Sequence, residues 1–138
     1  MVRIMSFAPS RARFSSAIYA AGMFGSCELS LGPRHNITLP ITDIVAPAEI
    51  AADLVLTVRV TIESGGCRRL EQLRVTRTAS RATIVAYGFD TEGPGVNCPA
   101  DIRHDVRQLS LVPPFSDPFT LVARQPNDSE TVRVIRVR

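Results

Sequence analysis

The sequence predicts an all-β protein: a single antiparallel β-sandwich of about seven strands behind an N-terminal leader. Three observations support this. Residues 54–63 alternate between apolar and polar side chains, with one exception, as a half-buried strand does. Turn residues recur roughly every 8–12 positions, the spacing of sandwiches and small barrels. No helical period of useful length follows Pro40, and 138 residues fit one domain.

The first 26 residues resemble a targeting segment and not part of the domain. Arg3, Arg11 and Arg13 are the only charged residues before position 28, and an apolar or small run over 14–26 follows them. A positive segment, a short apolar run and small residues before a break are typical of a secretory signal peptide. The run is shorter than the roughly 20 residues of a transmembrane helix. An amphipathic helix packed on the domain is the alternative, although the run lacks a polar face.

The end of this segment resembles the lipobox of bacterial lipoproteins. Gly25 and Ser26 match the small positions, Cys27 matches the lipid-accepting cysteine, and Phe24 stands where Leu is usual. The resemblance implies that Cys27 becomes a diacylated N-terminus that anchors the protein to a membrane of the cell envelope. Two acyl chains give stable anchoring, whereas one holds a protein only marginally. We therefore expect a signal peptide at 1–26, a tether at 27–40 that could finish in an edge strand, and the sandwich domain at 41–138.

The strands are expected in order along that domain. The run over 82–89 is apolar on both faces, as in a central strand. The run over 102–111 changes phase, which predicts a β-bulge near Arg107 and Gln108. The last run also slips in phase, between Val134 and Ile135. The expected strands cover residues 41–45, 54–63, 70–78, 82–89, 102–111, a run from Phe119, and 131–137.

Strand number and spacing resemble those of immunoglobulin-like domains. The span from Cys67 to Cys98 is compatible with the bridge that joins the two sheets of such domains, but the chain has no Trp. The resemblance therefore concerns the general architecture only.

Three cysteines become an even pair once Cys27 is assigned to lipid. Cys67 and Cys98 both lie beside turn residues, and a bridge between them would close a loop of about 31 residues and contribute roughly 3–4 kcal/mol. The alternatives are two free thiols or a metal pair with His104. Because no CxxC-like pair exists, and an exported chain favours pairing, we predict the disulfide.

The charge balance disfavours nucleic acid as a partner. All 13 acidic residues lie from Glu28 onward, together with 13 of the 16 arginines, and the chain has no Lys. Without its leader the protein is formally neutral. The positive net charge of the whole chain therefore does not indicate nucleic-acid binding.

The only concentration of titratable groups is Asp101, His104 and Asp105. Strand alternation would turn both carboxylates away from His104, and a metal site needs three or four convergent ligands. We therefore predict no catalytic residue, no metal site, no cofactor and no enzymatic activity. The loop from Phe115 to Phe119 is a candidate partner contact, since aromatic residues dominate interface hot spots. The alternative places both rings in the core.

These expectations combine into a non-catalytic lipoprotein domain displayed on the envelope for binding or structural contact, its partner an envelope protein or a glycan. A second hypothesis is a soluble secreted inhibitor or ligand-binding sandwich. A third is a small hydrolase that uses Asp101, His104 and Asp105.

Overall fold

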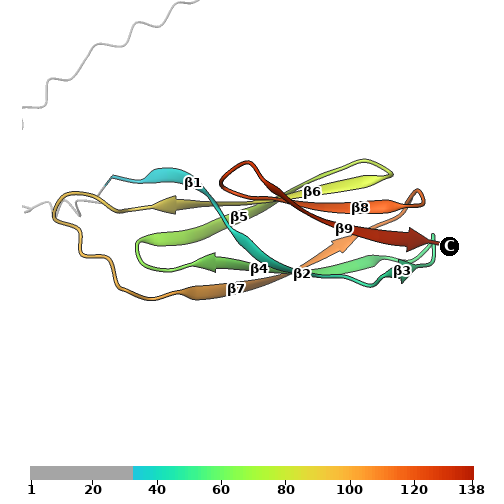
Figure 1. Cartoon of the computed structure of the whole chain (residues 1–138), viewed down its shortest axis with the longest axis horizontal. Helices are drawn as coiled ribbons and strands as arrows, with labels where there is room; N and C mark the ends of the chain where they lie inside the picture. Colours follow the sequence, from blue (N-terminus) through green and yellow to red (C-terminus); the bar gives the residue numbers. More distant parts are fainter. Residues whose placement is uncertain (1–32) are drawn as a thin grey trace, which may run out of the picture.

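A computed structural model describes residues 33–138, which form an all-β structure without a helix. Two sheets pack face to face as a β-sandwich, and the described chain enters beside β1 and ends at the opposite end after β9 (Figure 1). The predicted fold class is confirmed at this level. The strands are β1 (His35–Leu39), β2 (Ile41–Val45), β3 (Glu49–Ile50), β4 (Leu56–Ser64), β5 (Arg68–Arg77), β6 (Arg81–Asp90), β7 (Arg103–Leu111), β8 (Phe119–Arg124) and β9 (Glu130–Val137).

The first two strands are one extended segment that changes sheets at Pro40. β1 pairs antiparallel with β6 in the larger sheet, and β2 pairs with β4 in the three-stranded sheet β2-β4-β7. Leu39 is fully buried in the core. The segment expected as a tether thus ends in a strand of the sandwich, and the folded unit includes residues from His35 onward.

The topology is more complex than seven antiparallel strands. The described residues form nine strands, and two pairings are parallel: β6 with β8 and β3 with β9. β1 and β8 lie along the same edge of β6, and β5 lies along its other edge. The two-residue β3 is too short to show a period, and a parallel pairing joins segments far apart in the chain. Neither feature leaves a local sequence signal.

The predicted bulge in β7 is wrong. β7 pairs with β4 in unbroken register from Leu111, opposite Leu56, to Arg103, opposite Ser64. β7 is an edge strand, so its outer apolar side chains, such as that of Val106, stay exposed. The side chains of β7 that face the opposite sheet are those in phase with Leu111, and Asp105 is among them. The carboxylate of Asp105 accepts a hydrogen bond from the buried Ser64 hydroxyl at 2.8 Å.

The phase slip in β9 has the same origin. β9 pairs with β8 without a register shift; Ile135 points inward, while Val132 and Val134 lie on the outer face. The bulges occur elsewhere, between Leu70 and Gln72 in β5 and near the start of β2.

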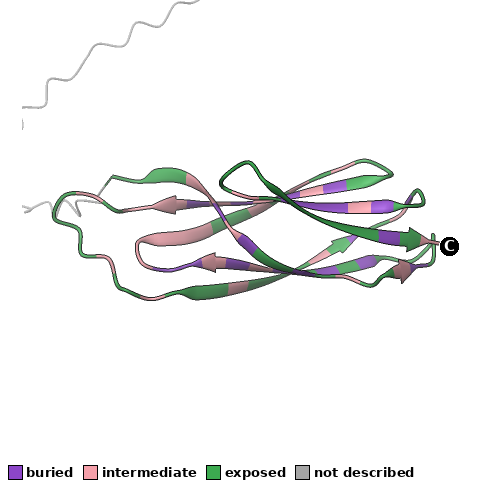
Figure 2. Cartoon of the chain, in the orientation of Figure 1, coloured by how far each residue is buried: buried purple, intermediate pink, exposed green. Residues whose placement is uncertain are grey.

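The core lies between the two sheets and follows the alternation of the central strands (Figure 2). In β4 and β6, every second side chain is buried and those between are at least partly exposed. The buried set draws on both sheets: Leu39, Ile41, Ile44, Ile50, Leu56, Val58, Val60, Ile62, Ala82, Ile84, Ala86, Leu111, Phe115, Phe119, Leu121, Ala123 and Ile135.

Candidate functional site

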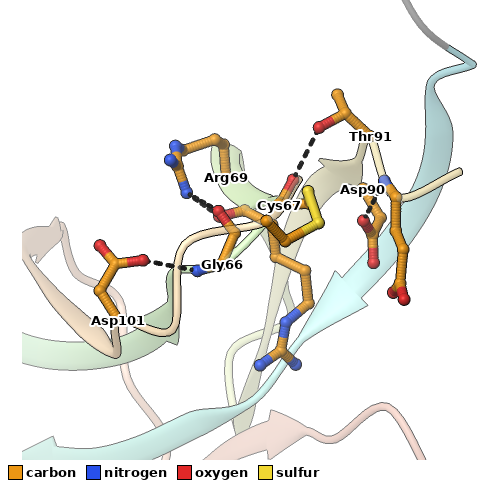
Figure 3. The surroundings of a disulfide bond; sticks show 9 residues. Gly66, Cys67, Arg69, Asp90, Thr91 and Asp101 are labelled. Atoms are coloured by element: carbon orange, nitrogen blue, oxygen red, sulfur yellow. Dashed lines mark hydrogen bonds between the residues drawn. A yellow bond between two sulfur atoms is a disulfide. The ribbon is translucent and has the colours of Figure 1, made fainter. Parts of the chain in front are cut away.

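The predicted disulfide between Cys67 and Cys98 is present, with the two Cα atoms 5.1 Å apart. The bond ties the turn between β4 and β5 to the long loop over 91–102, at the end of the sandwich where the described chain enters (Figures 1 and 3). A disulfide of this kind indicates an oxidising, extracytoplasmic location.

Main-chain hydrogen bonds hold the loop beside the disulfide (Figure 3). The carbonyl oxygen of Cys67 accepts hydrogen bonds from the N–H of Thr91 at 3.2 Å and from its hydroxyl at 3.3 Å. The N–H of Gly66 donates to the carboxylate of Asp101 at 2.9 Å. The side chain of Arg103 donates from Nε to the same carboxylate at 2.6 Å. The Gly66 N–H, and after it Arg103, lower the pKa of Asp101 below its ordinary value.

Gly65 is required by the turn that carries the disulfide. Its φ is +109°, and a Cβ there would lie 2.3 Å from the carbonyl oxygen of Asp101. A side chain would therefore meet main chain that cannot move without disturbing the loop.

The structure does not bring together the residues of the hydrolase hypothesis. Asp101 lies on the loop and is engaged by Gly66 and Arg103. Asp105 faces the inner side of β7 beside Ser64, whereas His104 is exposed at a position opposite Glu63. Among residues 33–138, no group of three His, Cys, Asp or Glu side chains is placed to hold a metal ion.

The candidate contact at Phe115 and Phe119 is corrected by the structure. Phe115 is 8% exposed and Phe119 is fully buried, and the two rings pack edge to face with centroids 4.9 Å apart. Arg77 covers Phe115, with its guanidinium carbon 4.7 Å from the ring centroid. Because β8 begins at Phe119 with its side chain inward, both rings close the core and neither is an exposed anchor.

The outer face of β1, β6 and β5 carries two arginines stacked on aromatic rings. The guanidinium carbon of Arg34 lies 3.9 Å from the ring centroid of Phe89, and that of Arg74 lies 5.1 Å from that of Tyr87. The two rings stand two residues apart on β6 and so share one face. Neither arginine forms an ion pair within the described part of the chain.

A shallow pocket of about 270 Å³ lies on this same face. The bulge in β5 adds Glu71 to the strand, so that Glu71 and Gln72 are both placed at the pocket. We call the combined surface the arginine–aromatic face; its residues are Arg34, Asn36, Glu71, Gln72, Arg74, Tyr87 and Phe89.

Sequence reasoning missed this face. Tyr87 and Phe89, spaced by two in a strand, were a signal for a shared surface. Arg74 comes from β5 and Arg34 directly precedes β1, and only the pairing of β1 and β5 with β6 brings them to the rings.

Cys27, the predicted lipid acceptor, lies outside the described residues, as do the leader at 1–26 and residues 27–32 of the predicted tether. Residues 33–138 contain no helix long and apolar enough to cross a bilayer. Comparisons of the chain with protein-family models, with curated proteins and with solved structures found no match.

Proposed function

We propose that this protein is a non-catalytic, extracytoplasmic binding domain, displayed on the cell envelope through a lipid on Cys27, and that it binds an acidic glycan on its arginine–aromatic face. The disulfide supports an exported location, and the stacked arginines support the ligand class.

The stacked arginines are the observation that carries the ligand assignment. A guanidinium held against an aromatic ring loses little further freedom on binding, and its outward N–H groups match the two oxygens of a carboxylate. Arg34 and Arg74 are held in this way on neighbouring rings, and neither forms an ion pair with a carboxylate among residues 33–138.

The rest of the pocket favours a saccharide over a simple anion. The side chains of Asn36 and Gln72 offer amide donors and acceptors, and Glu71 offers an acceptor, which together suit hydroxyl groups. The two rings lie about 7 Å apart along the strand, so the two arginines favour an extended ligand with repeated acidic groups.

The lipid anchor is tested by the intact mass of the natively expressed protein from membrane and soluble fractions, with and without reduction. We expect a membrane-bound species that starts at Cys27, carries acyl mass and gains two hydrogens on reduction. A soluble species cut near position 26 without acyl mass would favour the secreted alternative. A species that keeps Met1 and has three free thiols would refute export.

Glycan binding is tested by calorimetric titration with oligogalacturonate, an oligomer of uronic acids, and with maltohexaose as the neutral control. We expect binding of the acidic oligomer only, weakened about tenfold in Arg74→Ala, the loss of about one charged hydrogen-bonding partner. Arg107→Ala is the matched control, because Arg107 is an exposed arginine on the other sheet that stacks on no aromatic ring among residues 33–138. Equal weakening in both variants would indicate general charge attraction and would refute a built site.

A further inference from the structure

One edge of β9 is unpaired along most of its length. β8 pairs with β9 on one side from Glu130 to Ile135, and β3 pairs with the other side only at Arg136 and Val137. In the described structure, the stretch from Glu130 to Val134 therefore has a free edge, bounded by the turn that joins β8 to β9 and by β3.

The hydrogen bonds show which main-chain groups face this free edge. The N–H groups of Arg136 and Arg138 donate to carbonyl oxygens of the β3 segment at 3.0 Å. Successive N–H groups of a strand point in opposite directions, so those of Val132 and Val134 point the same way as that of Arg136. Their N–H and C=O groups are thus available to a further strand.

Two exposed valines make the outer face of this stretch apolar enough to favour pairing. Val132 and Val134 are 50% and 60% exposed on the outer face. On the inner side, a groove of about 380 Å³ separates β9 from the segment over 43–48, with Asp43 and Arg133 among its lining residues. A strand added to β9 would place its inner side chains in this groove.

The edges of β5 and β7 differ from this one in charge and shape. β5 is bulged at Glu71 and carries arginines at both ends, and β7 carries Arg103 and Arg107 among further polar residues. Charges and bulges are the features by which natural sheets prevent pairing at their edges. The free stretch of β9 has no bulge, its outer face presents Val132 and Val134, and its charged residues are Glu130 and Arg133.

We propose that two copies of this chain pair through the free edges of their β9 strands, antiparallel about a two-fold axis at Val132. Val132 then lies opposite the partner's Val132, and Glu130 lies opposite the partner's Val134. This inference does not depend on the proposed glycan site.

The limits of the free stretch fit a second copy in this register. Pairing centred on Val132 uses the five residues from Glu130 to Val134 on both chains. From Arg136 onward, β3 of the same chain occupies the edge of β9. The partner's residues that would lie opposite Arg136 belong to its β8–β9 turn, so pairing ends at the same point on both chains. The symmetric pairing is isologous and closes as a dimer, so it does not extend into a fibre.

The charges permit this register. Glu130, whose carboxylate pairs with Arg81 of its own chain at 3.2 Å, lies diagonal to the partner's Arg136 on the outer face. On the inner face, the partner's Arg133 lies opposite Thr131 and diagonal to Arg133, beside the groove that Asp43 lines. No pair of like charges lies directly opposite across the axis.

A cysteine cross-link tests the pairing in native membranes with the full chain. Directly opposed residues in a hydrogen-bonded antiparallel pair have Cα atoms about 5.5 Å apart, within disulfide range. We expect Val132→Cys to form a covalent dimer on mild oxidation. Val106→Cys, equally exposed at 51% on β7, should remain monomeric. Absence of the Val132→Cys dimer, or equal cross-linking in both variants, would overturn the proposal.

Charge variants then test the register, with self-association of the natively processed protein measured by sedimentation equilibrium. Val132→Lys places two lysines directly opposite each other and should raise the dissociation constant about tenfold or more. Val134→Lys places each lysine opposite the partner's Glu130 and should leave association close to that of the unmodified protein. A wild-type monomer throughout, or equal weakening by both substitutions, contradicts pairing at Val132.

Discussion

Removal of the Cys67–Cys98 bridge should cost this domain a large part of its stability. The double variant Cys67→Ala, Cys98→Ala keeps the hydrogen bonds that Thr91 donates to the Cys67 carbonyl and that Gly66 donates to Asp101. These bonds use no cysteine side chain. The loop therefore keeps its native contacts, and the loss arises mainly in the unfolded chain, which the bridge no longer restricts.

The sequence separation of 31 residues sets the magnitude of this loss. In the chain-entropy treatment, a closed loop of that size lowers the entropy of the unfolded state by about 12 cal/mol/K, or about 3.7 kcal/mol at 25 °C. Single domains are stable by about 5–15 kcal/mol, so the variant should stay folded at 25 °C. Its Tm should fall by about 15 °C or more.

Urea denaturation followed by circular dichroism measures the effect, with calorimetry for the Tm. The reduced wild-type protein should match the double variant, and reductant should leave the variant unchanged. A loss below about 1 kcal/mol, or a wild-type protein insensitive to full reduction, would refute the argument that this loop restricts the unfolded chain.

Three further predictions address the turn, the carboxylate and the core. Gly65→Ala should destabilise the fold by about 3 kcal/mol in urea, since its Cβ would meet the Asp101 carbonyl. Gly95→Ala, with positive φ but nothing within 4 Å, should cost about 1 kcal/mol; equal losses would contradict the steric argument. The pKa of Asp101 is lowered in the folded state, so its ionised form stabilises the fold above its ordinary pKa of 3.8, and this contribution disappears as pH falls through the lower folded value. Asp101→Asn should therefore flatten the acid limb of the free energy of unfolding against pH, and an unchanged acid limb would count against this role. Phe119→Ala should cost about 3–5 kcal/mol because the ring is fully buried, whereas Val112→Ala, at an exposed site, should stay within about 0.5 kcal/mol; comparable losses by thermal unfolding would show that the core assignment is wrong.

Local patterns were sufficient for the parts of the fold that have one solvated and one buried face. The alternation in β4 predicted a strand from 54 to 63, and the structure places it at Leu56–Ser64 with Val58, Val60 and Ile62 in the core. The cysteine count, read with the expected export, predicted the Cys67–Cys98 pair. The first signal lies within the strand that it describes, whereas the second follows from the count, because only two cysteines remain once Cys27 is assigned to lipid.

The sequence was ambiguous where a strand lies at an edge. β7 and β9 each contain apolar residues in both phases of the strand alternation. The sequence pattern therefore predicted a bulge in β7 and a phase slip in β9, whereas both strands pair in unbroken register. An edge strand has little sheet around it, so apolar residues such as Val106 and Val134 remain exposed on its outer face. Which phase faces the core depends on the opposite sheet, and the strand's own periodicity does not contain that information.

The sequence alone therefore determined that the chain is all-β, where most strands lie and which cysteines pair. Only the tertiary structure decided that Arg34 and Arg74 stack on neighbouring rings of β6, and that β9 keeps a free edge from Glu130 to Val134. The physical reason is the range of the interactions. Alternation and turns act between neighbours in the chain, whereas strand order joins segments tens of residues apart and creates the surfaces on which binding depends.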